Sequence, residues 1–578
     1  MNFHYSEMRN VQVLIYLLKY YGIKKIIASP GQCNVPFVSS IQQDDFFEVY
    51  SCVDERSAAY MAVGMAEETG EQIVISCTGA TASRNYMSAM TEAFYRKLPI
   101  IVVTSSHDDV SKGHLIAQVT DRSTPPSDVA VVSYGLPCIV SKEDEWDCII
   151  KINRGLQLYK TQPGPVHFNL MRDRGPSGNS VEVLPPARTI QLYKNGEPLP
   201  AFEPNKKIAV FIGSHKRFTE EEVGAIERFC ELHNSVVFSD HTGGYKGKYL
   251  IHYALFGAQE TISYDMGKID YLIHIGEISG DYDTLQKITP NEVWRVSEDG
   301  MFRDTFKKLT KVFCMSELEF FSNYNIGSSI NTSYYESLKN KYNKLRSSIP
   351  EIPLSNIYVA SFLSPKMPVN CTLYLGILHT LRSWNYFELP SGINTVSNVG
   401  GFGIDGIVSS MLGASLCNRD KLYFAILGDL SFFYDMNSIG QRDLSNNVRI
   451  LVINNGHGQE FQFYNRASAF MGEDVNAYVA AAGHYGNKSR ELLKHYVQDL
   501  GFDYYAASTK EEFNNVYKYF IDPTITSKPV LLEVFTENDD ENQALKAIRN
   551  IEVDEAAIAK RKIKSVIRGI SSIITNKK

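Results

Sequence analysis

The sequence of 578 residues contains no apolar run near the ~20 residues that a membrane-spanning helix needs. Its N-terminus shows no basic region before an apolar core and no small-residue cleavage site, which argues against a secretory signal peptide. Its nine cysteines form no CxxC pair, so neither a disulfide framework nor a zinc site is indicated. We therefore expect a protein of the reducing cytoplasm.

An excess of positive charge is also missing. The chain has 58 Lys and Arg against 65 Asp and Glu, a formal net charge of −7, which gives no overall footprint for nucleic acid. There is no low-complexity segment, and no repeat beyond two related α/β halves. A hydrophobic content of 44% with 21% charged residues describes an ordinary globular protein. Length alone suggests about three or four domains.

The most informative stretch that is present is Lys421–Phe461. Its pattern predicts a buried strand ending at Asp429, a helix over Ser431–Leu444, and a second strand ending at Asn455. A right-handed crossover places the two turns side by side at the carboxyl ends of neighbouring strands. Open α/β sheets bind ligands at that edge.

The carboxylate of Asp429 and the carboxamide of Asn455 make a hard oxygen site suited to Mg²⁺ or Ca²⁺. Backbone N–H groups at the start of the following helix would favour a phosphate, so the predicted ligand is a magnesium diphosphate. For either residue taken alone, a helix cap at Asp429 or an ordinary Asn-Gly turn at Asn455 is the preferred interpretation. Their spacing favours the metal site.

This pattern resembles the diphosphate-binding motif of thiamine diphosphate enzymes, GDG followed by just under thirty residues and NN. Leu430 replaces the last glycine, as in the branch of 2-succinyl-5-enolpyruvyl-6-hydroxy-3-cyclohexene-1-carboxylate synthase. The resemblance implies thiamine diphosphate and Mg²⁺ as cofactors. It also implies a metal held by Asp429, Asn455 and the backbone carbonyl of His457, with Gly428, Leu430 and Ser431 at the diphosphate.

The first part of the chain repeats a β/α rhythm in which Glu55 ends the second predicted strand, in the turn DERSA. Burial beside the next helix should raise the pKa of this carboxyl, although Asp54 or Glu55 could instead merely cap that helix. In the resembling family such a glutamate hydrogen-bonds the aminopyrimidine ring and promotes ylid formation. The resemblance also places beside the pyrimidine a small-residue loop comprising Thr78, Gly79, Ala80 and Asn85.

The predicted fold class is α/β, with three consecutive domains built on mainly parallel sheets. The first and third have the thiamine diphosphate-binding fold, and the middle domain is Rossmann-like and is expected to be a structural spacer. A basic amphipathic tail helix could lie on a membrane, but packing on its own protein is the favoured interpretation. The predicted boundaries are 1–180 for the pyrimidine domain, 181–205 for a linker, 206–345 for the middle domain, 355–540 for the diphosphate domain and 550–578 for the tail helix.

A second hypothesis rests on GFGIDG at Gly401–Gly406, which satisfies the dinucleotide-binding pattern GxGxxG with Asp429 near the end of the next strand. An NAD(P)-dependent oxidoreductase would need a clear strand before this loop, but Asn394–Asn398 is short and polar. The resemblance offers another role for the loop. It places Gly403 and Ile404 at the cofactor, with the isoleucine wedged between its two rings.

The substrate half of the resemblance is incomplete. Cys33, His107 and Val399 stand where the resembling synthase has arginines for its multiply carboxylated substrates, so the literal synthase reaction is rejected. We expect a smaller donor such as pyruvate, and a keto sugar or similar polar carbonyl as acceptor. The candidate substrate residues are Gln32, Cys33, Asn34, His107, His114, Gln118, Val399 and Gln459.

These observations predict a thiamine diphosphate- and Mg²⁺-dependent 2-oxo acid decarboxylase and carboligase. A simple decarboxylase without ligation is the nearer alternative, and a non-catalytic relative is disfavoured because Glu55, Asp429 and Asn455 are all retained. The family arrangement also implies a homodimer or homotetramer, because its glutamate and its diphosphate motif meet across a subunit interface.

Overall fold

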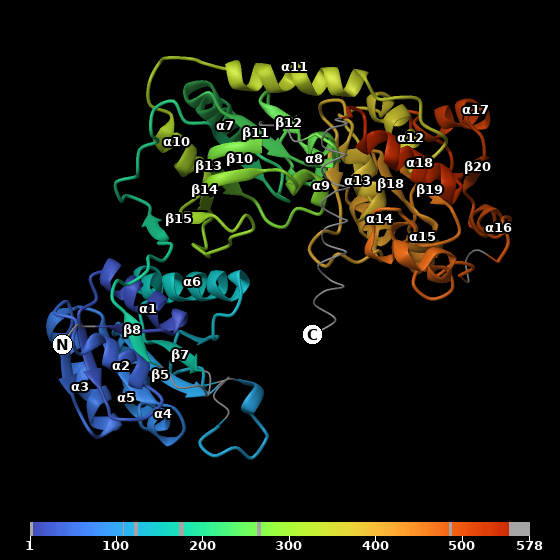
Figure 1. Ribbon diagram of the computed structural model, residues 1–578. Coiled ribbons are helices and arrows are strands. Elements are labelled where there is room, and N and C mark those ends of the chain that lie inside the picture. The colour runs from blue at the N-terminus through green and yellow to red at the C-terminus, as the bar shows by residue number, and fades with distance from the viewer. Residues whose placement is uncertain are drawn as a thin grey trace. The chain divides into compact units, whose positions relative to one another are not determined.

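The computed structural model describes residues 4–107, 109–120, 125–172, 178–262, 267–484 and 488–553 (Figure 1). Residues 554–578, which hold most of the predicted tail helix, lie outside the described residues. None of the described helices is both long and apolar enough to cross a membrane. The chain forms two compact units, one of residues 1–199 with 293–315 and one of residues 200–292 with 316–578.

The first unit is built on a six-stranded parallel sheet in the order β3-β2-β4-β5-β7-β6. The sequence predicts strands at residues 26–28, 47–52, 73–77, 100–104 and 166–170, and all five are present, whereas β6 is an additional strand of this sheet. This confirms the α/β fold class with mainly parallel sheets. The strands are β2 (Lys25–Ala28), β3 (Glu48–Ser51), β4 (Ile73–Thr78), β5 (Ile100–His107), β6 (Val132–Leu136) and β7 (Val166–Arg172).

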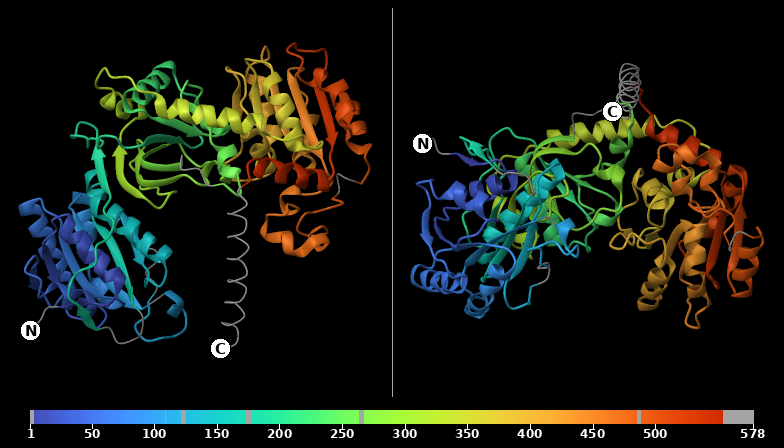
Figure 2. Two further views of the ribbon diagram at one scale, coloured as in Figure 1. Left: turned by 45° about the horizontal axis from the view of Figure 1, so that its top comes forward. Right: turned by 60° about the horizontal axis from the view of Figure 1, so that its bottom comes forward.

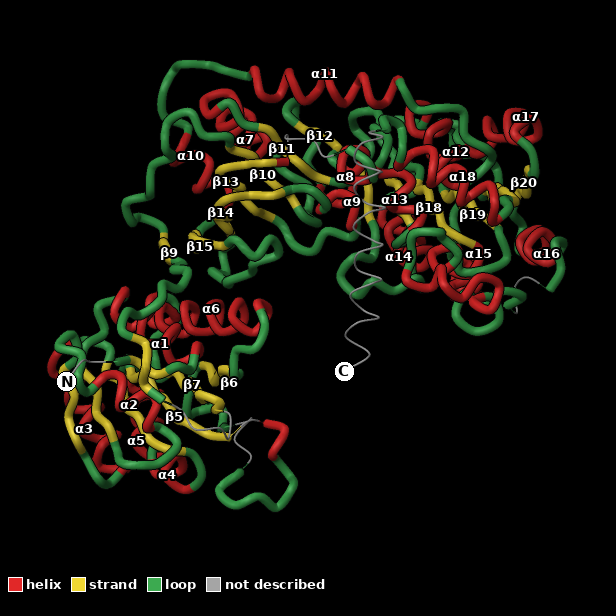
Figure 3. Tube along the Cα trace, in the orientation of Figure 1, coloured by secondary structure: helices red, strands yellow, loops and turns green. Residues whose placement is uncertain are grey.

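Helices cover this sheet, as the tube in Figure 3 shows. Small residues on α3 and α5, among them Ala62 and Ala93, pack on strand residues such as Ile75 and Val102. On the other side α1 packs against α6, which lies along β6 and β7. The helices are α1 (Arg9–Tyr20), α2 (Val35–Ile41), α3 (Glu55–Thr69), α4 (Thr81–Asn85), α5 (Met87–Arg96) and α6 (Lys142–Gln157).

The segment 181–205 differs from the surface linker that its prolines predict. It contains β9 (Gln191–Lys194), which pairs in parallel with β15 (Leu309–Cys314). The side chains of Ile190 and Leu192 are buried there. Pairing with a strand more than a hundred residues away leaves no local signal in the sequence, which explains the difference.

The second unit begins with parallel strands in the order β12-β11-β10-β13. Its helix α7 (Glu220–His233) starts with a capping box between Thr219 and Glu222, as a polar N-terminus followed by an apolar stripe predicts. The long helix α11 (Ser333–Ser347) then runs alongside these strands toward the next sheet (Figures 1 and 2). The strands are β10 (Ile208–Ile212), β11 (Val236–Ser239), β12 (Leu250–His252) and β13 (Lys268–Ile275).

The last sheet has the order β17-β16-β18-β19-β21-β20 and is parallel throughout. One face is covered by α14 (Ile407–Cys417), α15 (Asp429–Asp435) and α16 (Leu492–Asp499). The other helices of this part are α12 (Asn356–Leu363), α13 (His379–Asn385), α17 (Lys510–Phe520) and α18 (Asn538–Arg549). Its strands are β16 (Thr372–Leu375), β17 (Asn394–Val396), β18 (Tyr423–Gly428), β19 (Val448–Asn454), β20 (Asp503–Ala507) and β21 (Val530–Phe535).

The helix predicted over Ser431–Leu444 is shorter and starts earlier. It begins at Asp429, and after Asp435 it continues as a 3₁₀ helix only to Gly440. The apolar spacing beyond Gly440 predicts helix, whereas the chain turns there toward β19.

Candidate functional site

The crossover between β18 and β19 brings the two motif turns together, as predicted. Asp429 is the first residue of α15, and its side chain is 1% exposed. Its Oδ2 accepts a hydrogen bond from the backbone N–H of Gly456 at 3.1 Å. His484 Nε2 lies 2.9 Å from the same oxygen. A carboxylate is therefore held in a buried position beside the turn Asn454–Gly456, called the amide turn below because it carries the side-chain amide of Asn455.

Asn455 supplies the unusual feature of this turn. Its Oδ1 is shielded from solvent and has no hydrogen-bond partner among the described residues. A buried carbonyl oxygen without a partner costs free energy unless a ligand satisfies it. One carboxylate and one carboxamide, together with the nearby carbonyl of His457, are the oxygen donors that Mg²⁺ takes from a protein when a diphosphate completes its coordination. The residues present thus fit a magnesium diphosphate.

The described residues hold no group of three or more His, Cys, Asp or Glu side chains arranged for a metal.

The loop GFGIDG contacts this site directly. Ser431 on α15 donates its hydroxyl to the backbone carbonyl of Ile404, so the two predicted cofactor segments meet. The strand before the loop, β17, has only three residues and lies at the end of the strand order. A dinucleotide loop follows a strand inside the sheet. The geometry therefore favours a loop that packs on the start of α15, and it disfavours a dinucleotide-binding loop.

The segment Ala480–Gly483 is hydrogen-bonded to the amide turn and to the residue that follows His457. The N–H of Gly458 donates to the carbonyl of Ala480 at 2.6 Å, and that of Gly483 to the carbonyl of Gly456 at 3.3 Å. The ring of His457 lies 2.9 Å from Gln459, whose buried amide donates in turn to Asn538. The predicted substrate residue Gln459 is thus already engaged within its own unit.

Glu55 in the first unit does not cap the helix that it begins, because its neighbour Asp54 does so. Asp54 caps α3 by accepting from the N–H groups of Arg56 and Ser57, so Glu55 is not the cap. Its Oε2 accepts a hydrogen bond from Asn85 Nδ2 at 2.9 Å. This contact joins the predicted catalytic carboxyl to the predicted pyrimidine loop. The side chain is half-buried within its unit, less than the sequence suggests.

Two turns at the carboxyl edge of the first sheet lie against each other. A Cβ added to Gly31 would come within 2.4 Å of Thr78, so the first turn needs glycine for this close approach. In the pyrimidine loop, Ala80 adopts a positive φ of 54° directly before α4. Such a strained position in a non-glycine residue is common at functional loops.

The candidate substrate residues of the first unit divide by exposure. Cys33 and Asn34 are buried, and the amide of Asn34 donates to the carbonyl of Ser29 at 2.9 Å, which gives it a structural role. Gln32, His114 and Gln118 are exposed, whereas His107 ends β5 and is half-buried.

Val399 lies in the second unit and is buried among apolar groups. A Cβ on Gly280 would lie 2.4 Å from Val399 Cγ1 and 3.0 Å from Leu381. This position therefore packs against its neighbours and offers no polar group to a substrate.

Two site residues escaped the sequence analysis. Arg172 ends β7 in register with His107, and its guanidinium donates to the carbonyl of Gln32 at 3.2 Å. The predicted strand stopped at Leu170, two residues short, so this arginine was not placed at the rim. His484 lies 55 residues from Asp429, and no local pattern links the two.

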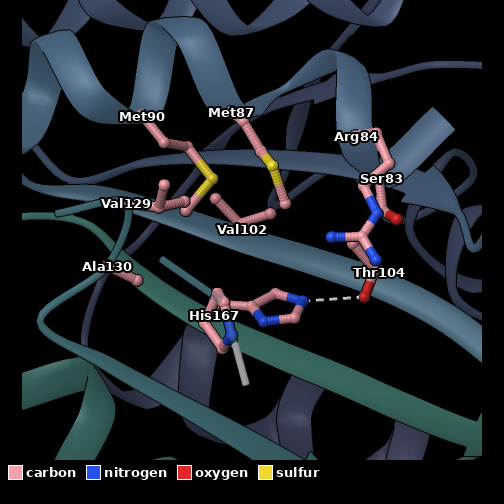
Figure 4. A pocket seen from close by; sticks show the side chains of 10 residues that line it. Ser83, Arg84, Met87, Met90, Val102, Thr104, Val129, Ala130 and His167 are labelled. Carbon is pink, nitrogen blue, oxygen red and sulfur yellow. Dashed lines mark hydrogen bonds between the residues drawn. The ribbon is translucent and has the colours of Figure 1, made fainter. Parts of the chain in front are cut away.

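A pocket in the first unit does not add to the site. Apolar side chains of α5 and β5, including Met87, Met90 and Val102, face His167 across it (Figure 4). His167 is held between the hydroxyls of Thr104 and Ser133 at 2.8 and 2.7 Å. The cavity of about 30 Å³ has room for little more than a water molecule. It cannot hold a substrate.

Comparison with known proteins agrees with this geometry. Residues 8–124 match the family model of the thiamine pyrophosphate enzyme N-terminal TPP binding domain. The chain is also 27% identical over 563 residues to the 2-succinyl-5-enolpyruvyl-6-hydroxy-3-cyclohexene-1-carboxylate synthase of Bacteroides thetaiotaomicron, covering 94% of this chain and 98% of the relative. The synthase of Flavobacterium johnsoniae is 27% identical over 486 residues, covering 79% of this chain and 85% of the relative. The predicted resemblance is confirmed.

Proposed function

The chain carries the N-terminal TPP binding domain of the thiamine pyrophosphate enzymes, and from this premise we propose that it is a thiamine diphosphate- and Mg²⁺-dependent decarboxylase and carboligase of 2-oxo acids. The observation that carries the proposal is the buried Oδ1 of Asn455, which has no hydrogen-bond partner among the described residues, beside the carboxylate turn of Asp429. It is the kind of oxygen that a bound cation would satisfy.

The chain's own residues divide the work between the two units. Asp429, Asn455 and the carbonyl of His457 would hold the metal, and Ser431 would lie at the diphosphate. Glu55 would hold a proton at the aminopyrimidine ring, a role for which its contact with Asn85 orients it. Bound thiamine diphosphate would supply a carbanion centre that adds to the 2-oxo carbonyl and takes up the electrons released with CO₂.

We further propose a donor with a single carboxylate, such as pyruvate, and a polar acceptor such as a keto sugar. The buried position of Val399 leaves no charged group there, and among the described residues Arg172 brings a guanidinium next to His107 and Gln32. A guanidinium at this position suits a donor carboxylate, because an unpaired buried carboxylate would cost several kcal/mol. The curated relatives are named for a different, multiply carboxylated product.

The cofactor is tested by denaturing the purified protein and identifying what it releases. We expect thiamine diphosphate and a divalent metal. A nicotinamide dinucleotide without thiamine would instead support the alternative based on GFGIDG.

The substrate is tested by incubating the enzyme with a panel of 2-oxo acids and measuring CO₂ release, with and without carbonyl acceptors. We expect pyruvate to be decarboxylated faster than 2-oxoglutarate. An acceptor that adds no new product would favour a simple decarboxylase, and efficient turnover of 2-oxoglutarate with isochorismate would contradict the argument from the missing arginines.

A further inference from the structure

Glu533 is a carboxylate that none of the cofactor motifs includes. It lies within β21, and its side chain is fully buried. One oxygen accepts a hydrogen bond from Asn454 Nδ2 at 2.6 Å, and the other accepts from the hydroxyl of Tyr504 at 2.7 Å. Burial raises the pKa of this carboxyl, while the two hydrogen bonds oppose that shift. Burying a carboxyl costs free energy even when both of its oxygens accept hydrogen bonds. We therefore asked which neighbouring groups this carboxyl holds in place.

The three side chains form a line across neighbouring strands. In the register of the sheet, Glu533 pairs with Val452 on β19 and with Ala506 on β20. Side chains two residues away on the same strand lie on the same face. Asn454 and Tyr504 therefore share the face of Glu533, and this is the face that α15 and α16 cover.

The line ends at the metal-binding turn, Asn454–Gly456. Asn454 is fixed twice, by its side chain to Glu533 on β21 and by its carbonyl, which accepts from the N–H of Thr536, the residue after β21, at 3.1 Å. On the other side of the turn, the N–H of Gly456 is fixed to Asp429. Asn455, whose Oδ1 has no partner in the part of the chain that the structure describes, is held between these two anchors.

We propose that Glu533 is a positioning residue that holds the metal-binding turn through Asn454, and so sets the affinity of the site for its divalent cation. This inference rests on the proposed function, because the cation is the Mg²⁺ of that proposal. Partners that orient the ligands of a metal commonly change its affinity by about 10- to 100-fold when they are replaced.

The test is to titrate Mg²⁺ into the full chain saturated with thiamine diphosphate, using calorimetry. Glu533→Gln keeps the shape of the side chain but presents an amide that cannot accept from both partners. We expect at least about a 10-fold weaker apparent affinity for Mg²⁺. Glu491→Gln is the matched control, because it removes a surface carboxylate, paired with Lys494, from the same part of the chain. Its affinity should match that of the parent.

A double-mutant cycle separates positioning from a general effect of charge. If Glu533 acts through Asn454, then Asn454→Ala combined with Glu533→Gln should weaken Mg²⁺ binding no more than the worse single variant. Additive losses would contradict that route. Should Glu533→Gln not fold, Tyr504→Phe removes one anchor of the same carboxylate, and it too should weaken Mg²⁺ binding.

The outcomes distinguish the two proposals. A parent protein that binds neither thiamine diphosphate nor Mg²⁺ would overturn the proposed function. A parent that binds both, with Glu533→Gln equal to Glu491→Gln, would overturn the role of Glu533 alone.

Discussion

Glu55 and Asn455 are the two side chains on which the proposed function depends most. The carboxyl of Glu55 is released from helix capping by Asp54 and is oriented by Asn85. The Oδ1 of Asn455 has no partner in the described structure although it is shielded from solvent. In the proposed function, the first arrangement would prepare a group for proton transfer, and the second would prepare an oxygen for a cation.

Replacing Glu55 by Gln should separate binding from chemistry. The amide keeps the shape and the contact with Asn85 but cannot take up or release the proton. We expect cofactor binding close to that of the parent, and turnover lower by more than about 10²-fold. Proton exchange at thiazolium C2 in deuterated buffer measures the step directly.

A control for this variant is available on the same helix. Glu67→Gln removes an exposed carboxylate that pairs with Arg96, and it should leave exchange unchanged. If exchange in Glu55→Gln matched the parent, Glu55 would have no part in the proton transfer.

Sequence reasoning succeeded at residues whose signal is local. Asp429 and Asn455 end consecutive strands of one crossover, so spacing and chain direction suffice to place them together. Glu533 carries no such signal, because it stands inside an apolar strand and its partners come from two other strands. Arg172 was missed for a smaller reason, since the predicted end of β7 fell two residues early.

At the scale of elements, α18 is anchored by a buried ion network inside the second unit. Arg549 near its end donates to both oxygens of Asp283 at 2.9 and 2.8 Å and to Glu260 at 3.0 Å. Asp283 also accepts from the hydroxyl of Tyr386 at 2.6 Å. These contacts join α18 to the segments that follow β12 and β13, so helix and sheet depend on one another.

Arg549→Met should therefore destabilise the second unit. The substitution removes the guanidinium that pairs with the buried carboxylate of Asp283. Breaking a buried ion pair of this kind costs about 3 kcal/mol or more. The measurement is the shift in urea unfolding monitored by circular dichroism. Arg303→Met removes an exposed pair with Asp299 in the first unit, and it should shift the transition by less than about 1 kcal/mol. Equal shifts in the two variants would show that the network adds no stability.

The parallel pairing of strands within the sheets could be expected from the β/α rhythm, but the partner of β9 could not. Parallel neighbours joined by one helix follow from chain direction and handedness. The pairing of β9 with β15 joins segments far apart in the sequence, and only the buried Ile190 and Leu192 indicate it.

At the scale of the whole molecule, the predicted catalytic carboxyl and the predicted metal turn belong to different compact units. We propose that a complete site needs two copies of the chain, one supplying Glu55 and the other Asp429. Exposed apolar side chains on and before α3, including Val53, Tyr60 and Met61, are consistent with a surface for self-association.

Mixing two inactive variants tests this proposal. Glu55→Gln and Asp429→Ala subunits should each be inactive alone, and hybrids should regain activity because one of their two sites is intact. Refolding the variants together and assaying CO₂ release provides the measurement. A fully active monomer in sedimentation would exclude a shared site.

The position of Tyr504 on an outer strand affects how the metal-binding turn responds to heating. It stands on β20, the last strand in the order of its sheet, and an outermost strand opens more readily than those inside. Because Tyr504 anchors Glu533, transient opening of that strand would loosen the turn at Asn455 while the rest of the sheet stays closed. Amide hydrogens of Asp503–Ala507 should then exchange at temperatures where the metal is already being lost, well before the domain unfolds.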